Sequence, residues 1–259
     1  MAGAESRAAP GRDFGLRLAS ALVLAPAALG CLFAGGWLWG LLVAVAGVLM
    51  AGEWRRLVGA PAWSQAATAV LAVIVVALGA SQSVIAVTVL VAIAAAVMAV
   101  LASPGAGLGA LYVGLPVAAL AWLRTDPVLG RDILLFGLVA VWATDIGAYL
   151  VGRSVGGPKL APGISPGKTW SGLAGGVAAA AAVGWLAQDH LPLERLPLIG
   201  AGLALVAQAG DLFKSALKRR AGVKDSGALI PGHGGVIDRV DGVVAMALAL
   251  AAARLGGAW

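Results

Sequence analysis

The sequence has 259 residues, of which 61% are hydrophobic and only 12% charged, and its formal net charge is +6. A soluble globular domain carries about 25% charged residues, so this composition excludes that class. The mean hydropathy of +0.95 and the apolar runs along the whole chain predict an all-α, polytopic integral membrane protein. The single cysteine, Cys31, excludes an internal disulfide and a cysteine-based metal cluster.

In chain order, residues 1–15 are small, polar and charged, and we expect a disordered cytosolic N-terminus there. About nine transmembrane helices follow, and no internal repeat supports an inverted-repeat transporter. The expected spans are approximately 16–35, 36–52, 66–80, 83–102, 108–123, 132–152, 171–188, 196–213 and 240–256.

The distribution of basic residues gives this order of spans an orientation. With the N-terminus inside, fourteen of the 18 Lys and Arg residues fall on the cytosolic side. Only Arg124, Arg131, Arg195 and Arg254 fall outside. Such a bias is the positive-inside pattern of multi-pass proteins, and it explains the basic pI without nucleic acid as a partner. The sequence therefore predicts a cell-membrane protein whose long loops face the cytosol.

Two of these cytosolic loops are long and rich in Gly and Pro: "GRSVGGPKLAPGISPGKTWSG" (152–172) and "SALKRRAGVKDSGALIPGHGGVIDRVDG" (215–242). Each follows a span that ends with a carboxylate, Asp145 in the first case and Asp211 in the second. At about 1.5 Å per helical residue, Asp145 lies roughly 12 Å from Arg153, below the headgroups. An ionisable group at that depth is costly, which favours a functional role.

The second loop leads into two more carboxylates, Asp238 and Asp241, which share one helix face. Capping of the last span would explain one of them. With Asp211 at the same depth, three carboxylates repel unless a cation lies among them, and Mg²⁺ suits oxygen ligands. The basic run that includes Lys218, Arg219 and Lys224 could hold polyphosphate. Topology or attraction to anionic lipid is the alternative reading of that run.

Two other familiar motifs fail on their spacing. "GISPGKT" is not a P-loop, because Gly163 and Gly167 enclose three residues where four are needed. His233 in "PGHGG" has no second His nearby, so zinc chemistry is not expected. Glycine on both sides of His233 instead allows the backbone to approach a ligand.

The second loop resembles the complete signature of the phosphatidate cytidylyltransferases. The matching residues are Ser215, Lys218, Arg219, Lys224, Asp225, Gly227, Ile230, Pro231, His233, Gly234, Gly235, Asp238, Arg239 and Asp241, preceded by Asp211 in "AGDLFKS". The first loop is similar to another motif of that family, through Asp145, Ala148, Tyr149, Gly152, Arg153, Leu160, Pro162, Ile164, Ser165, Pro166, Lys168, Thr169 and Gly172. The resemblance covers roughly residues 140–245. It divides the chain into N-terminal transmembrane helices (16–130) and a C-terminal catalytic region (131–259).

The resemblance implies that CTP and phosphatidate react to CDP-diacylglycerol and pyrophosphate in phospholipid biosynthesis, with Mg²⁺ as cofactor and a second cation left open. Asp211, Asp238 and Asp241 are the expected metal ligands and, with Lys224 and Arg239, the expected catalytic residues. The remaining expected contacts to substrate are Lys218, Arg219, His233, Gly234, Gly235, Ser215, Lys168, Arg153 and Asp145. A homodimer is also left open.

Three positions depart from the family pattern: Ile146 and Ser171 replace a hydroxyl residue and a glutamate, and a basic residue is displaced to Lys159. A CTP-dependent polyprenol or phytol kinase, which transfers the γ-phosphoryl group, is the nearest alternative. A secondary transporter is an alternative of another class, favoured by the intramembrane Asp145. A purely structural membrane protein would leave the clustered charges unexplained.

Overall fold

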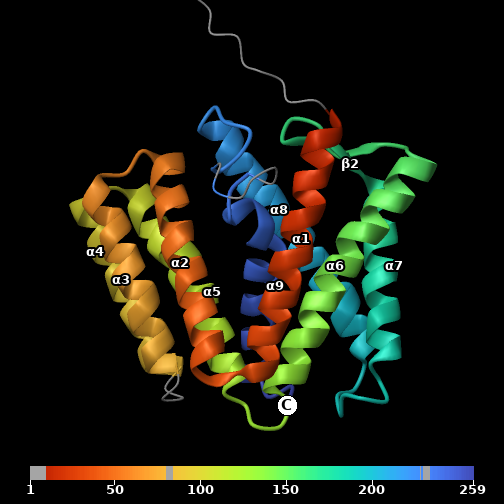
Figure 1. Cartoon of the computed structure of the whole chain (residues 1–259), viewed down its shortest axis with the longest axis horizontal. Coiled ribbons are helices and arrows are strands. Elements are labelled where there is room, and N and C mark those ends of the chain that lie inside the picture. Colours follow the sequence, from red (N-terminus) through yellow and green to blue (C-terminus); the bar gives the residue numbers. More distant parts are fainter. Residues whose placement is uncertain (1–9, 80–83, 228, 230–233) are drawn as a thin grey trace, which may run out of the picture.

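The computed structural model describes residues 10–79, 84–227, 229 and 234–259. Within these residues the chain forms nine helices and one short β-hairpin (Figure 1). The elements are α1 (Pro10–Ala34), α2 (Gly36–Val58), α3 (Ala62–Gly79), α4 (Val84–Leu101), α5 (Pro104–Arg124), α6 (Gly130–Val155), β1 (Lys159–Ala161), β2 (Ser165–Thr169), α7 (Trp170–Leu186), α8 (Leu196–Arg220) and α9 (Ile237–Leu255). The lead predicted for residues 1–15 lies mostly outside the described residues.

The helices run alternately up and down, so the molecule has two ends (Figure 1). The hairpin end carries β1, β2 and the connection from α8 to α9. The far end carries the turn from α1 to α2 and the C-terminus. Local sequence explains the reversals: Gly35 adopts φ +65 between α1 and α2, and Ser103 caps α5 by accepting a hydrogen bond from Ala106 N at 3.2 Å.

Each of the nine predicted spans coincides with a helix, but several helices extend beyond the apolar run. The predicted eighth span ends at 213, whereas α8 continues to Arg220, and α2 continues from 52 to Val58. Both extensions end with basic residues. Lys and Arg are good helix formers and complement the negative C-terminal end of the helix dipole, so the helix persists past the apolar stretch.

Six helices of the described chain are long and apolar enough to cross a membrane: α2, α3, α4, α5, α6 and α8. The apolar part of α1 and the whole of α7 are shorter, and α9 carries four charged residues in its 19. The lipid-facing character is clearest on α4, where Ile85, Val89, Ile93, Val97 and Val100 form an exposed stripe. The structure therefore supports a multi-pass membrane protein without establishing nine spans.

Exposed tryptophans occur near both ends of the helical bundle. Trp63 and Trp170 begin α3 and α7 at the hairpin end, whereas Trp37 and Trp185 lie at the far end. Tryptophan is enriched where a protein crosses the headgroup regions of a bilayer. These four side chains are therefore placed as membrane-interface anchors.

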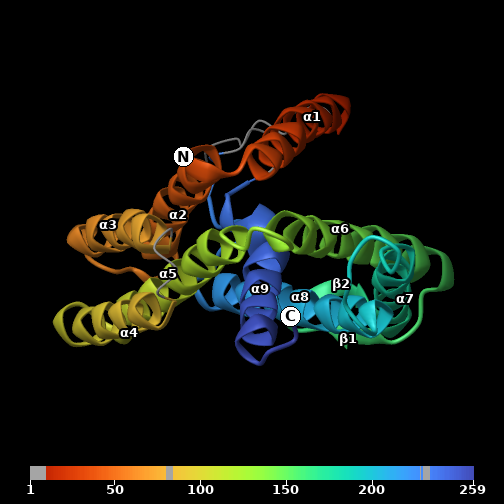
Figure 2. The ribbon, with the colours of Figure 1, turned by 90° about the horizontal axis from the view of Figure 1, so that it is seen from below.

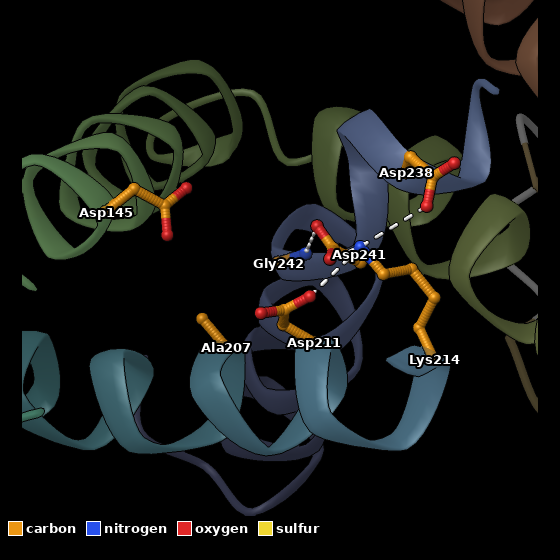
Figure 3. A pocket seen from close by; sticks show the side chains of 7 residues that line it. All are labelled: Asp145, Ala207, Asp211, Lys214, Asp238, Asp241 and Gly242. Atoms are coloured by element: carbon orange, nitrogen blue, oxygen red, sulfur yellow. Dashed lines mark hydrogen bonds and ion pairs between the residues drawn. The ribbon is translucent and has the colours of Figure 1, made fainter. Parts of the chain in front are cut away.

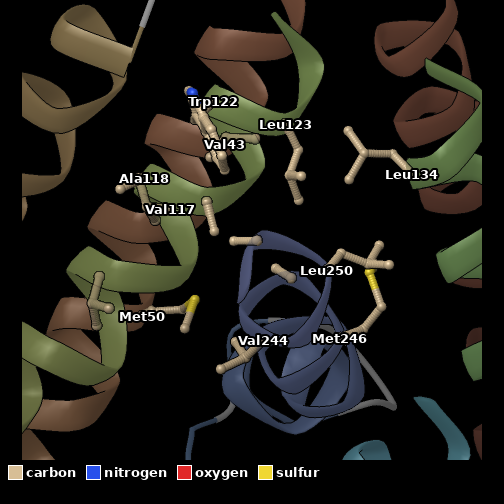
Figure 4. Packing of buried hydrophobic residues seen from close by; sticks show 14 of the residues in the cluster. Val43, Met50, Val117, Ala118, Trp122, Leu123, Leu134, Val244, Met246 and Leu250 are labelled. Carbon is tan, nitrogen blue, oxygen red and sulfur yellow. The ribbon is translucent and has the colours of Figure 1, made fainter. Parts of the chain in front are cut away.

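Viewed from the far end, α2–α5 form one group and α6–α8 another, with α9 between them (Figure 2). Helix α9 packs against α5, α6 and α8. Its buried side chains Met246 and Leu250 meet apolar side chains of both groups, including Leu123 and Leu134 (Figure 4). The helix that carries two of the predicted site carboxylates is thus held centrally in the core.

Helices α6 and α7 approach closely because both carry glycine at their contact. A Cβ on Gly147 of α6 would lie 2.7 Å from the Gly175 carbonyl oxygen, and one on Gly176 would lie 2.9 Å from the Thr144 carbonyl oxygen. Small residues let membrane helices pack with their backbones near contact. This packing fixes the position of the hairpin that joins the two helices.

At the far end an ion pair joins α9 to the connection between α5 and α6. Arg254 Nη2 lies 3.0 Å from Asp126 Oδ2, Arg254 Nη1 donates to the Trp122 carbonyl oxygen at 3.2 Å, and the guanidinium lies 4.3 Å from the Trp122 ring centroid. The backbone N–H of Leu129, helped by that of Val128 and by Arg254, lowers the pKa of Asp126 against an opposing effect of burial.

We predict that Asp126→Asn lowers stability at neutral pH by about 1–2 kcal/mol, because charge-assisted hydrogen bonds are lost. A lowered folded pKa means that this contribution is present above the ordinary Asp pKa of about 3.9 and is lost as the pH falls through the folded value. Thermal melts in detergent should therefore separate variant and wild type at pH 7 and bring them together at a pH below the folded pKa of Asp126. Asp189→Asn, which changes an exposed carboxylate of the same end, is the control and should match wild type at both pH values.

Candidate functional site

The hairpin end brings four carboxylates from three helices around one small cavity of about 170 Å³. Asp145 comes from α6, Asp211 from α8, and Asp238 and Asp241 from α9 (Figure 3). The sequence predicts that Asp211, Asp238 and Asp241 lie at one depth, and the structure brings these three together. Asp145, which the sequence places only below the headgroups, joins them from α6.

Lys214 occupies the centre of this acidic group. Its ammonium contacts Asp241 Oδ2 and lies 3.0 Å from Asp211 Oδ1 and 3.6 Å from Asp238 Oδ1. The side chain is only 7% exposed. Because buried carboxylates repel one another and lose their hydration, one ammonium shared among three of them offsets much of that cost. Asp211 and Lys214 are three residues apart on α8, so a single helix face supplies both signs of charge.

A second basic residue, Lys168, reaches the cluster from the hairpin. The register of the hairpin pairs Lys159 with Thr169, and Lys168 Nζ forms an ion pair with Asp211 and donates to Gln208 Oε1 at 2.7 Å. Thr169 ends the strand and caps α7 by accepting from Gly172 N at 3.0 Å. The first long loop is therefore anchored to α8 by its lysine rather than left free in solvent.

Asp238 is held from the opposite side by the second loop. Its Oδ1 accepts from Lys218 Nζ at 2.6 Å, and its Oδ2 accepts from the backbone N–H of Ser226 at 2.8 Å and, more weakly, of Gly235 at 3.4 Å. The first N–H groups of α9, however, are satisfied by Glu53 of α2. Asp238 lies in the first turn of α9, so the capping alternative weighed from the sequence explains part of its placement, and the contacts with Lys218 and Ser226 go beyond it.

A larger cavity of about 560 Å³ adjoins the small one and shares Asp145 and Asp211 with it. It lies between α6, the hairpin and the start of α7. Basic side chains and glycines make up much of its lining: Arg153, Lys159, Lys168, Gly152, Gly156, Gly157, Gly167 and Gly172. The carboxylate of Asp145 makes no hydrogen bond or ion pair with any described residue, so it is available to a ligand. One cavity is acidic, its neighbour is basic, and the two meet at Asp145 and Asp211.

The donor chemistry of the small cavity suits a hard divalent cation, since carboxylate oxygens are the ligands that Mg²⁺ prefers. Among the residues that the structure describes, no three carboxylates or imidazoles stand at ligand spacing. The ammonium of Lys214 lies among these carboxylates instead. The carboxylates are therefore the right type of ligand for a divalent cation. For a metal ion to bind, the Lys214 ammonium would have to move away from part of the cluster.

The remaining predicted site residues are placed as follows. Arg219 donates to the Ile164 carbonyl oxygen at 3.3 Å and thereby connects α8 to the hairpin. Gly234, with φ +82, lies beside Asp238. Ser215 is partly buried, Lys224 and Arg239 are exposed, and these three line neither of the two cavities. His233 lies outside the described residues.

Sequence reasoning missed Lys214, Gln208, Ser226 and Glu53. Lys214 was counted only as a basic residue of the topology, although its position three after Asp211 signals an ion pair. Glu53 had a stronger signal, because it is the one carboxylate of α2 and an ionisable group within a span is a candidate functional residue.

Comparison with known proteins finds one matching family model and several similar enzymes. Residues 15–255 match the model of the cytidylyltransferase family. The chain is similar to the phosphatidate cytidylyltransferase of Pseudomonas aeruginosa, with 37% identity over 268 aligned positions that cover 94% of this chain and 97% of the relative. The enzymes of the same name from Brucella suis and Bacillus subtilis are 49% and 43% identical, over 57% and 52% of this chain. These two alignments span only about half of the relatives' lengths, 55% and 51%.

We predict that Lys214→Met is strongly destabilised in metal-free buffer, by about 3–5 kcal/mol, because removing one partner of a buried ionic group leaves uncompensated charge. Added Mg²⁺ should recover part of this loss, since the carboxylates then have room for a cation. Thermal melts with and without Mg²⁺ measure both effects. Lys224→Met, which removes an exposed ammonium of the same end, should melt like wild type; equal melting of Lys214→Met would contradict the central role of its ammonium.

Proposed function

The chain belongs to the cytidylyltransferase family, and on that premise we propose that it is a phosphatidate cytidylyltransferase. It would join the cytidylyl group of CTP to the phosphate of phosphatidate, giving CDP-diacylglycerol for phospholipid synthesis. The observation that carries the proposal is the meeting of Asp211, Asp238 and Asp241 at one cavity, beside a second cavity lined by basic side chains. This arrangement suits a reaction between two polyanions.

In the proposed reaction an oxygen of the lipid phosphate bonds to the α-phosphorus of CTP. The bond from that phosphorus to the oxygen bridging the α- and β-phosphates breaks, and pyrophosphate leaves with the electron pair. A phosphate monoester is already nucleophilic, so no Ser, Cys or His nucleophile is needed. The protein must instead bring two anions together and neutralise their charge.

The larger cavity is the proposed site for the nucleotide. Arg153, Lys159 and Lys168 line it and supply donors to phosphate oxygens. Lining glycines leave room for a ligand and let it approach the backbone. Lys168 also contacts Asp211, so a triphosphate bound by this lysine would end at the boundary with the small cavity. Lys218, which holds Asp238, is the proposed contact on the other side of that boundary.

We further propose that Asp211, Asp238 and Asp241 hold Mg²⁺, with a second cation left open. Bound there, the ion would neutralise phosphate charge that the basic side chains alone leave uncompensated. In this arrangement Lys214 would be the exchangeable counter-charge of the carboxylates, neutralising them while no cation is bound and giving way to one that binds. Asp145, which lines both cavities, is placed to hydrogen-bond a ligand at their junction.

The hairpin end is the proposed cytosolic face of the cell membrane. The described helices place Arg55, Arg56, Lys218, Arg219 and Arg220 at that end, and Arg124, Arg131, Arg195 and Arg254 at the far end. This asymmetry follows the positive-inside rule. A site at that depth lets soluble CTP meet a lipid headgroup while the acyl chains stay in the bilayer.

Product identity tests the proposal directly. Purified protein in phosphatidate-containing vesicles should convert CTP labelled at the α-phosphorus into labelled lipid, with one pyrophosphate released per lipid formed. Release of CDP with transfer of the γ-phosphoryl group to a lipid alcohol would identify a kinase instead. Flux of a solute into sealed vesicles without CTP turnover would identify a transporter.

We predict that Asp238→Asn lowers turnover at least about 100-fold, comparable to removing a principal electrostatic contributor. Asparagine keeps the shape but removes the negative charge that Lys218 and a divalent cation require. The measurement is turnover at saturating Mg²⁺ for protein whose folding is checked by its melting curve. Asp132→Asn, at the far end beside Arg131, is the matched control, and near-normal turnover of Asp238→Asn would refute a catalytic role for that charge.

We also predict that Lys168→Gln lowers catalytic efficiency for CTP about 10- to 150-fold, the effect of losing a charge-assisted contact of about 1.5–3 kcal/mol. Kinetics with CTP varied at fixed phosphatidate give the value. The control is Arg56→Gln, which changes an exposed basic residue of the same end.

The triphosphate contact expected for Lys224 predicts a similar loss of catalytic efficiency for CTP in Lys224→Gln. Unchanged efficiency there would mean that its ammonium stays in solvent.

A further inference from the structure

Glu53 is a carboxylate of α2 with no exposed surface. Its Oε1 accepts a hydrogen bond from Val236 N at 2.8 Å, and its Oε2 accepts one from Ile237 N at 2.9 Å. These N–H groups begin α9, whose own N-cap residue provides no side-chain hydrogen bond. The N-terminus of α9 is therefore capped by a different helix, more than 180 residues earlier in the chain.

Ser226 connects Glu53 to Asp238. Its hydroxyl oxygen lies 3.0 Å from Glu53 Oε2 and 2.9 Å from Asp238 Oδ2, and its one proton can be donated to only one of them at a time. Its backbone N–H donates to Asp238 Oδ2 as well. A change in the position or charge of Glu53 therefore alters the position of Asp238 in two ways. One is through Ser226, which contacts both carboxylates, and the other is through the first turn of α9, which carries Asp238.

Glycines at two positions of the second loop make the approach of Glu53 possible. A Cβ on Gly235 would overlap both Glu53 Oε2 and Ser226 Oγ, and a Cβ on Gly227 would lie 2.9 Å from Glu53 Oε1. At these two positions the loop therefore has no side chain beside the buried carboxylate. This close fit is independent of the hydrogen bonds and points to the same contact.

Aromatic side chains beside Glu53 link the same two regions. Trp54 stacks on Tyr112 of α5 with ring centroids 4.6 Å apart, and Tyr112 is 5.9 Å from the Phe213 ring of α8, next to Lys214. Helix α2 is therefore linked to the site in two ways: to α8 through Tyr112 of α5, and to α9 by the hydrogen bonds of Glu53.

We propose that Glu53 is a positioning residue for the reaction: it aligns the first turn of α9 and, through Ser226, sets the orientation of Asp238. A buried carboxylate is stable where hydrogen bonds and a helix N-terminus compensate its lost hydration. Here the compensating groups belong to the helix that carries Asp238 and Asp241. The kinetic part of this inference rests on the proposed function, whereas the structural part does not.

Glu53→Gln is the primary variant. The amide keeps the size of the side chain, but only its oxygen can accept a hydrogen bond, so one of the two N–H groups loses its acceptor. Glu53→Asp keeps the charge on a side chain one methylene shorter and should recover part of the lost function. Thr68→Val is the matched control: Thr68 is a buried polar residue of α3 whose hydroxyl hydrogen-bonds Met98 Sδ, at 3.8 Å, and no other residue that the structure describes. It removes a buried polar group without touching the site.

The first readout is hydrogen exchange of the peptide covering residues 234–240 in the intact protein, without substrate. We expect at least about tenfold faster exchange in Glu53→Gln and no change in Thr68→Val. Unchanged exchange in Glu53→Gln would overturn the inference, whether or not the protein proves to be a cytidylyltransferase. If Glu53→Gln fails to fold, the same measurement on Glu53→Asp and Ser226→Ala decides, and exchange equal to wild type in both would overturn it.

The second readout is turnover per folded molecule as Mg²⁺ is varied. A positioning role predicts that Glu53→Gln loses about 10- to 100-fold in kcat and requires more Mg²⁺, with KM for CTP little changed, as found for residues that orient a ligating side chain. If folded Glu53→Gln has the kcat and the Mg²⁺ dependence of the wild type, Glu53 only caps the helix and the proposal is overturned. Absence of lipid product from the wild type itself would instead refute the proposed function.

Discussion

The ammonium of Lys214, shared among Asp211, Asp238 and Asp241, is the interaction on which the hairpin end depends. Two helices bring carboxylates to one depth, and without a counter-charge their repulsion and lost hydration would separate the helices. The lysine comes from the same helix as one of its partners, so the cluster forms as soon as α8 and α9 pack. Lys168 and Lys218 then neutralise the two sides of the group and attach the flanking loops to it.

Packing in the two groups of helices is achieved by different means. Helices α6 and α7 are in near backbone contact through glycines, which fixes the hairpin and its lysine with little freedom. Helix α4 presents branched aliphatic side chains outward, as expected where lipid is the neighbour. Central α9 packs against α5 of the first group and against α6 and α8 of the second, so a displacement of either group is transmitted to Asp238 and Asp241.

The N-terminal helices contribute to the site through polar groups as well as through apolar packing. At one end of α9, Glu53 accepts hydrogen bonds from the first N–H groups of the helix. At the other end, Arg254 forms an ion pair with Asp126 and donates a hydrogen bond to the Trp122 carbonyl oxygen. Both contacts compensate helix termini: a carboxylate at the positive end of α9, and an arginine in its last turn. The helix that carries the site carboxylates is thus restrained at both ends by residues from the other half of the chain.

The sequence alone determined the class and the helices. Apolar length suffices for these, because a chain in a bilayer must satisfy its backbone hydrogen bonds internally and does so as helices. It also placed Asp211, Asp238 and Asp241 at one depth, since depth follows from position along a span. Tertiary structure alone decided which charges touch. Lys214 rather than the loop lysine Lys224 lies among the carboxylates, and Glu53 caps a helix far along the chain. Such contacts depend on helix rotation and on which helices become neighbours, and neither quantity is contained in the hydropathy or spacing of a single chain.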